Sequence, residues 1–255
     1  MNKDRIFTQK ITLPYSAMAA NNHIRLDRIL TLFQDSAALH ALELGISGYD
    51  LEKIGLKWFI SRYQVQVHGS LQLGQPLVLK TWRLPWKNLY ELRQFTIVNV
   101  HDLPVISALG VWVMVRAQNS KPVRLAPHMP AALMTRTAPA PDLWMNDPDL
   151  SGFDHEKKFC IQIHDLDMNQ HVNNTVYVTW AMETLPISWL FKYTPHSLVV
   201  SYLKESFYPD TIIVRTKLCR QNKFIKTGHA IFHAASGTKL ACLTFTWKKI
   251  SHGPV

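Results

Sequence analysis

The 255-residue chain contains few cysteines and few glycines. Its three cysteines are odd in number, far apart and without the spacing of a metal site. Ten glycines and a hydrophobic content of 47% exclude a fibrous or disordered chain and describe a globular one. The cysteines fall in apolar, strand-like stretches, so we expect three buried free thiols in a reducing cytoplasm: Cys160, Cys219 and Cys242.

Long hydrophobic runs are also absent. No stretch approaches the roughly 20 apolar residues that cross a bilayer. The start of the chain, from Met1 to Ile6, lacks the apolar core of a signal peptide. We therefore expect no membrane span and a cytoplasmic protein. At 255 residues the chain can form one large domain or two ordinary ones.

Acidic residues are scarce relative to basic ones. The chain has 28 Lys and Arg against 18 Asp and Glu, a formal net charge of +10. Such a charge attracts acidic partners. The basic residues are dispersed and form no recognised nucleic-acid motif, so we do not expect a nucleic-acid partner. An acidic protein, or an anionic phosphopantetheine or coenzyme A tail, fits the charge equally well.

The most informative stretch is D-L-D-M-N-Q-H-V-N-N-T-V-Y, residues 165–177. Asp167, Asn169 and His171 alternate along it, so an extended segment would point all three side chains the same way. A carboxylate, an amide and an imidazole that converge on one spot are typical of a polar site. Short Asx-rich segments before helices are often only caps and turns, but the longer string is far more specific.

A helix is expected directly after this triplet. Either Asn173 or Asn174 can cap its start, and apolar residues recur at helical spacing beyond them. These residues are Val176, Tyr177, Trp180, Ala181 and Leu185. The triplet therefore lies on a turn at a helix N-terminus, where free N–H groups favour developing negative charge. Such a position suits the stabilisation of an oxyanion.

The remaining pattern indicates strands and helices in an order that occurs twice. The expected first series is a strand at 7–15, a helix at 26–44 ended by Gly45, a short helix at 49–54 and strands at 57–68, 75–84, 89–100 and 105–116. The expected second series is a strand at 158–164, a helix from 174 to about 186 and strands at 196–207, 210–220, 224–235 and 240–249. Between the two series, residues 119–156 hold six of the fourteen prolines.

The two series also match in sequence. N-N-H-I at 21–24 aligns with N-Q-H-V at 169–172, and L-V-L-K-T at 77–81 aligns with I-I-V-R-T at 212–216. An internal repeat of this size suggests two copies of one α+β unit. Ala19 stands where the second copy has Asp167, so the first copy lacks a base. We expect Asn21 and His23 to be turn residues.

The string at 165–177 resembles the active-site signature of the acyl-acyl-carrier-protein (acyl-ACP) thioesterases, both the plant plastid enzymes and their bacterial relatives. The resemblance covers roughly residues 7–250. It implies an α+β tandem hot-dog fold, in which each half is an antiparallel sheet wrapped around a long central helix. We therefore predict a non-catalytic, acyl-binding N-terminal unit (1–118), a proline-rich linker (119–156) and a catalytic C-terminal unit (157–255).

The same resemblance implies the site residues. Asp167 matches the essential carboxylate, Asn169 the paired amide and His171 the motif histidine. The segment Y-L-K-E-S matches the family segment that supplies a further glutamate, here Glu205. A plant cysteine is replaced by Ser206, which favours attack by water over attack by a cysteine. Whether Asp167 acts as a base, orients the water or attacks directly stays open.

The implied reaction is hydrolysis of fatty acyl-ACP to free fatty acid and carrier protein, terminating or editing fatty acid synthesis, without metal or other cofactor. The implied partner is an acidic acyl carrier protein that bears a phosphopantetheine-linked chain, and a homodimer is a further expectation. Alternatives are an acyl-CoA thioesterase and a non-catalytic acyl-binding hot-dog protein, although the latter would be expected to lose Asp167. A hot-dog dehydratase would carry a different motif. Chain-length preference stays open.

Overall fold

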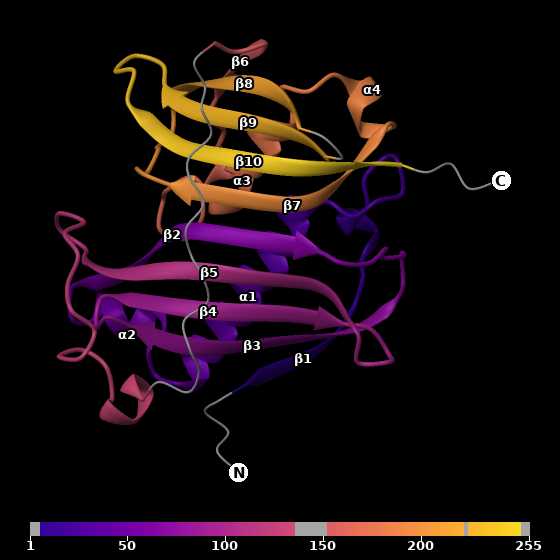
Figure 1. Ribbon diagram of the computed structural model, residues 1–255. Helices are drawn as coiled ribbons and strands as arrows, with labels where there is room; N and C mark the ends of the chain where they lie inside the picture. Colours follow the sequence, from indigo (N-terminus) through magenta and orange to yellow (C-terminus); the bar gives the residue numbers. More distant parts are fainter. Residues whose placement is uncertain (1–5, 136–151, 222–223, 251–255) are drawn as a thin grey trace. The chain divides into compact units, whose positions relative to one another are not determined.

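The computed structural model describes residues 6–135, 152–221 and 224–250 (Figure 1). The chain divides into two compact units. The first comprises the chain up to Tyr15 and from Thr31 to Trp144, and the second comprises Ser16–Leu30 and the chain from Met145 onward. The turn that precedes the first long helix therefore belongs to the second unit, together with the motif at 165–177.

The first unit contains an antiparallel sheet with strand order β1-β3-β4-β5-β2 (Figure 1). Its strands are β1 (Phe7–Thr12), β2 (Leu56–Val67), β3 (Pro76–Trp86), β4 (Tyr90–Val98) and β5 (Pro104–Arg116). The helices are α1 (Leu26–Glu43), which begins in the second unit, and α2 (Gly48–Glu52), with short 3₁₀ turns η1 (Tyr15–Ala17) and η2 (Ala131–Met134). The apolar face of α1 packs on the sheet, where the rings of Phe33 and Phe95 stack with centroids 4.6 Å apart.

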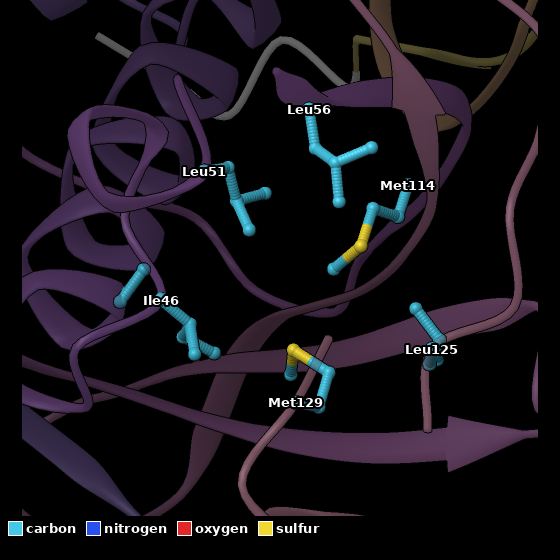
Figure 2. Close-up of a cluster of buried hydrophobic side chains, with 7 residues drawn as sticks. Ile46, Leu51, Leu56, Met114, Leu125 and Met129 are labelled. Carbon is cyan, nitrogen blue, oxygen red and sulfur yellow. The ribbon is translucent and has the colours of Figure 1, made fainter. Parts of the chain in front are cut away.

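The chain after β5 packs against the same unit. Leu125 and Met129 lie in a buried cluster with Met114 of β5 and with residues around α2 (Figure 2). Leu125 and Met114 are fully buried, which anchors this segment by the hydrophobic effect. The first part of the proline-rich stretch is therefore an ordered crossing, whereas its residues 136–151 lie outside the described residues. The predicted domain boundaries remain a prediction.

The second unit repeats the topology of the first, with strand order β6-β8-β9-β10-β7, again antiparallel (Figure 1). Its strands are β6 (His155–Cys160), β7 (Tyr193–Tyr202), β8 (Thr211–Gln221), β9 (Phe224–His233) and β10 (Lys239–Lys249). Its helical segments are η3 (Ile163–Asp165), α3 (Asn174–Met182) and α4 (Ile187–Leu190). Helix α3 packs against β8, β9 and β10, and its Trp180 stacks on Phe159 of β6.

Strand register supports the internal repeat. Phe7 pairs with Thr81 in the first unit, and His155 pairs with Thr216 in the second. These pairs are related by the same two offsets, 148 and 135 residues, that align the two halves in sequence. The predicted α+β class and the twofold order of elements are therefore confirmed.

Several local expectations were wrong. The strand expected at 7–15 ends at Thr12, and the strand expected at 196–207 ends at Tyr202. The strand expected at 158–164 ends at Cys160, and Ile163–Asp165 is a 3₁₀ turn because the Asp165 carboxylate accepts the N–H of Gln162 at 2.8 Å. Cys160 lies exposed on the edge strand β6 and Cys219 is half-buried, so only Cys242 fits the expected burial. None of the helices in the described residues is long and apolar enough to cross a bilayer.

Candidate active site

Three of the four predicted site residues, Asp167, Asn169 and His171, lie on a tight turn between η3 and α3. The N–H of Asp167 donates to the carbonyl of His171 at 2.8 Å, and Gln170 adopts a left-handed backbone with φ of 63°. A bridge between Leu166 and Val172 closes the turn. The segment is therefore not extended, and the simple alternation expected for Asp167, Asn169 and His171 was wrong, although they share one turn at the start of a helix.

The carboxylate of Asp167 is held by its neighbour Asn169. The backbone N–H of Asn169 donates to Oδ1 at 2.8 Å, and its side-chain Nδ2 donates to Oδ2 at 3.3 Å. These two hydrogen bonds, one to each oxygen, fix the direction of the carboxylate. Asp167 is half-buried, so it remains accessible to water or substrate.

His171 lies beside the second predicted carboxylate. Its Nδ1 is 3.4 Å from Oε1 of Glu205, and both side chains are about one-fifth exposed, 21% and 22%. The imidazole and the ring of Phe207 form a T-shaped contact with centroids 5.0 Å apart. Glu205 comes from the segment after β7, so the fold brings together residues more than thirty positions apart in the chain.

The helix that follows begins as the sequence indicates. Asn173 is the N-cap, and its side-chain oxygen accepts the N–H of Thr175 at 3.0 Å. Its own N–H donates to the carbonyl of Asp165 at 2.8 Å, which fixes the turn to η3. The N-terminus of α3, with its positive end of the helix dipole, therefore directly follows His171.

Ser206 is buried and its hydroxyl is hydrogen-bonded within the protein. Only 1% of it is exposed, and its Oγ is 2.7 Å from the hydroxyl of Tyr177 on α3. Its carbonyl accepts the N–H of Val172 at 3.1 Å. Ser206 thus connects the segment that bears Glu205 to the motif turn and to α3.

Tyr177 lies buried on α3, as its helical spacing predicts, but the spacing did not indicate the polar contact that its hydroxyl makes with Ser206. Burial raises the pKa of its phenol to about 12, an increase that the hydrogen bond with Ser206 opposes. The negative charges of Glu205 and Asp167 raise this pKa further. Its place at the end of the motif string was the signal that could have identified it.

Comparison with known proteins identifies related chains over almost the whole length. The family model for the acyl-ACP thioesterase N-terminal domain matches residues 4–133, and that for the C-terminal domain matches residues 151–249. A chloroplastic acyl-[acyl-carrier-protein] hydrolase of Cuphea viscosissima is 23% identical over 214 residues, covering 78% of this chain and 52% of that protein. The chain spans about half the length of the curated relatives it matches.

Two solved structures share the fold. A 12:0-ACP thioesterase from Umbellularia californica has a TM-score of 0.81 at 17% identity, covering 96% of this chain and 94% of its own. An acyl-ACP thioesterase from Bacteroides thetaiotaomicron has a TM-score of 0.84 at 16% identity, covering 95% and 98% respectively. These similarities confirm the expected tandem hot-dog fold.

Proposed function

The chain belongs to the acyl-ACP thioesterase family, and we propose that it hydrolyses fatty acyl-ACP to free fatty acid and carrier protein. The observation that carries the proposal is the motif turn, on which Asp167 and His171 lie at a helix N-terminus with Glu205 beside the imidazole. Thioester hydrolysis requires an activated water, donors for the oxyanion and room for an acyl chain. The turn supplies the first two.

In the proposed mechanism, Asp167 and Glu205 order and deprotonate the attacking water. Asn169 holds the Asp167 carboxylate in place, and His171 lies next to Glu205. Water adds to the thioester carbon and transfers a proton to a carboxylate. The resulting oxyanion is stabilised by N–H groups at the start of α3. Its collapse breaks the carbon–sulfur bond, and the departing thiolate takes up a proton to give the carrier thiol.

The environment of Ser206 supports attack by water. Its hydroxyl is directed to the Tyr177 phenol, whose pKa of about 12 keeps it protonated at neutral pH. A protonated phenol cannot remove a proton from a serine nucleophile. We assign Ser206 and Tyr177 to positioning, because their hydrogen bond fixes the segment that bears Glu205 relative to α3.

The proposed partner is an acidic acyl carrier protein, which is compatible with the positive charge of the chain. The net charge of +10 attracts an acidic surface and accelerates association. Coenzyme A carries the same phosphopantetheine arm and is the rival carrier. A homodimer and a cytoplasmic location remain predictions, the latter consistent with three free cysteines among the described residues.

The decisive experiment is a hydrolysis profile over acyl-ACP of increasing chain length, beside the matching coenzyme A esters. We expect a higher kcat/KM for the carrier-bound series, and activity that depends on Asp167. Higher kcat/KM for coenzyme A esters throughout would establish the rival substrate. Single-turnover hydrolysis in ¹⁸O-labelled water tests the chemistry. Attack by water puts the label in the fatty acid and none in Asp167, whereas label found in Asp167 would establish direct attack, with water opening the anhydride at the aspartyl carbonyl.

A further inference from the structure

A cavity of about 500 Å³ lies in the second unit, formed by residues other than the predicted catalytic ones. One wall is the turn at 18–27, which precedes and begins α1. The other walls come from α3, α4 and the adjoining strands. A hydrogen bond joins the turn to α4, since the side-chain amide of Asn21 donates to the carbonyl of Leu190 at 2.5 Å. The volume falls in the range of small-molecule sites, about 300–1,000 Å³.

The turn at this cavity has the same backbone as the candidate active-site turn. Ala19 N–H donates to the carbonyl of His23 at 2.8 Å, as Asp167 N–H does to His171. A bridge joins Met18 to Ile24, as one joins Leu166 to Val172. Asn22 has a φ of 59°, close to the 63° of Gln170. Every correspondence has the same offset of 148 residues, so the first repeat retains the framework that presents the motif.

Both carboxylates are missing from the first copy. Ala19 replaces Asp167, and at the 135-residue offset that relates the sheets Ser70 replaces Glu205. The first copy therefore retains the framework of the motif turn without either carboxylate of the motif, and the carboxylates that do line the cavity, Asp27 and Glu183, are paired with Arg25 and Lys157.

The walls favour a hydrocarbon chain. Most of them are apolar side chains from the helical segments and strands: Ile24, Val178, Met182, Leu185, Leu190 and Phe245. Mostly apolar walls with a few polar groups are typical of sites for small organic ligands. A flexible chain gains free energy with each methylene group that it buries there.

The polar groups of the cavity favour an uncharged head group. Arg25 donates to both carboxylate oxygens of Asp27, at 2.8 and 3.2 Å, and Lys157 pairs with Glu183 at 3.4 Å. These cations are therefore already neutralised. Burial lowers the pKa of His23, which favours its neutral form. A thioester carbonyl and the amides of a pantetheine arm are uncharged and match such surroundings.

We propose that this cavity is a second acyl site, which binds the chain of an acyl thioester without hydrolysing it. The ligand class rests on the proposed function, whereas the site rests on the cavity and the duplicated turn. One chain of the protein then holds two acyl groups, one at the hydrolytic turn and one in the cavity.

Binding stoichiometry tests the proposal. The probe is an N-acyl amide in which nitrogen replaces the thioester sulfur of acyl-pantetheine, so it cannot be hydrolysed as a thioester. Calorimetric titration of the Asp167→Asn protein should give two molecules per chain. Kd at the cavity should decrease about fourfold for each added methylene from the octanoyl to the dodecanoyl probe, the value for a fully buried chain.

Two substitutions that fill the cavity provide independent checks. Thr179→Trp and Leu185→Trp place a large ring at lining positions and should each reduce the stoichiometry to one. Ser188→Trp is the matched control, because Ser188 is exposed on α4 and does not line the cavity, and it should keep two. Circular dichroism verifies that each variant is folded.

A stoichiometry of one in the Asp167→Asn protein, or of two in both cavity-filling variants, would overturn the second site. Failure of the proposed function has a different signature, namely no acyl-ACP turnover by the unmodified protein. Turnover together with one bound probe would refute the second site alone. Two bound probes without turnover would refute the hydrolytic function alone.

Discussion

Replacement of Ser206 by alanine tests whether the Ser206 hydroxyl stabilises the fold or attacks the substrate. Ser206 and Tyr177 are 1% and 2% exposed, and their hydroxyls are 2.7 Å apart. Ser206→Ala leaves the phenol buried without this partner, which should reduce the free energy of unfolding by about 1–3 kcal/mol. The double variant with Tyr177→Phe removes both groups, so its stability should return towards that of the unmodified protein.

The rate is the second readout. If water attacks the thioester, kcat/KM for Ser206→Ala should stay within about tenfold of the unmodified protein, a barrier change of about 1.4 kcal/mol. Glu205→Gln should cost about 10²- to 10⁴-fold, as expected for loss of a general base. A serine nucleophile predicts the opposite ranking, with Ser206→Ala losing several orders of magnitude.

The assay combines kcat/KM on acyl-ACP with urea unfolding and mass spectrometry of the enzyme during turnover. Urea unfolding distinguishes lost chemistry from lost structure. A folded Ser206→Ala protein that is slower than Glu205→Gln would refute the reasoning, as would an acyl group found on Ser206. An acyl group trapped on Asp167 would instead establish direct attack through an anhydride.

Three further outcomes are expected. Asp167→Asn should abolish turnover with the fold retained, whereas His23→Ala should lower kcat/KM only slightly; equal losses in folded proteins would indicate two hydrolytic sites. Because the net charge is +10, kcat/KM for the carrier-bound substrate should fall with added salt more steeply than for a coenzyme A ester, and a flat response would contradict an acidic docking partner. Burial lowers the pKa of His229 from 6.5 to about 3. At pH values between these two pKa values, the unfolded chain binds more protons than the folded protein. The folded protein therefore loses stability as the pH falls below about 6.5. His229 should contribute about 2 kcal/mol of this loss at pH 5. In urea unfolding, the stability of His229→Gln should therefore decline less steeply with falling pH than that of the unmodified protein, whereas the exposed control His101→Gln should decline like the unmodified protein. Equal declines for His229→Gln and the unmodified protein would contradict the assignment to His229.

Local sequence determined the elements and most of the site. The spacing of apolar residues, helical or alternating, indicates whether a segment is a helix or a strand and which of its faces is apolar. That face is the one that packs in the core of the folded protein. The Asn173 cap and the Asp167–Asn169 hydrogen bonds join residues two positions apart, so neighbouring residue types suffice to produce them. The internal repeat could also be recognised from the sequence, because both copies keep the residues of the same turn and the same strand register.

Tertiary structure decided what depends on residues far apart in the chain. The pairing of Tyr177 with Ser206 and the approach of Glu205 to His171 join α3 and the motif turn to the segment after β7. No periodic pattern encodes such contacts, because they are set by how α3 packs on its sheet. Likewise, spacing placed Cys160 in a strand but not at the exposed edge of the sheet. The cavity beside the turn at 18–27 exists because that turn packs against α4, a contact between segments about 170 residues apart.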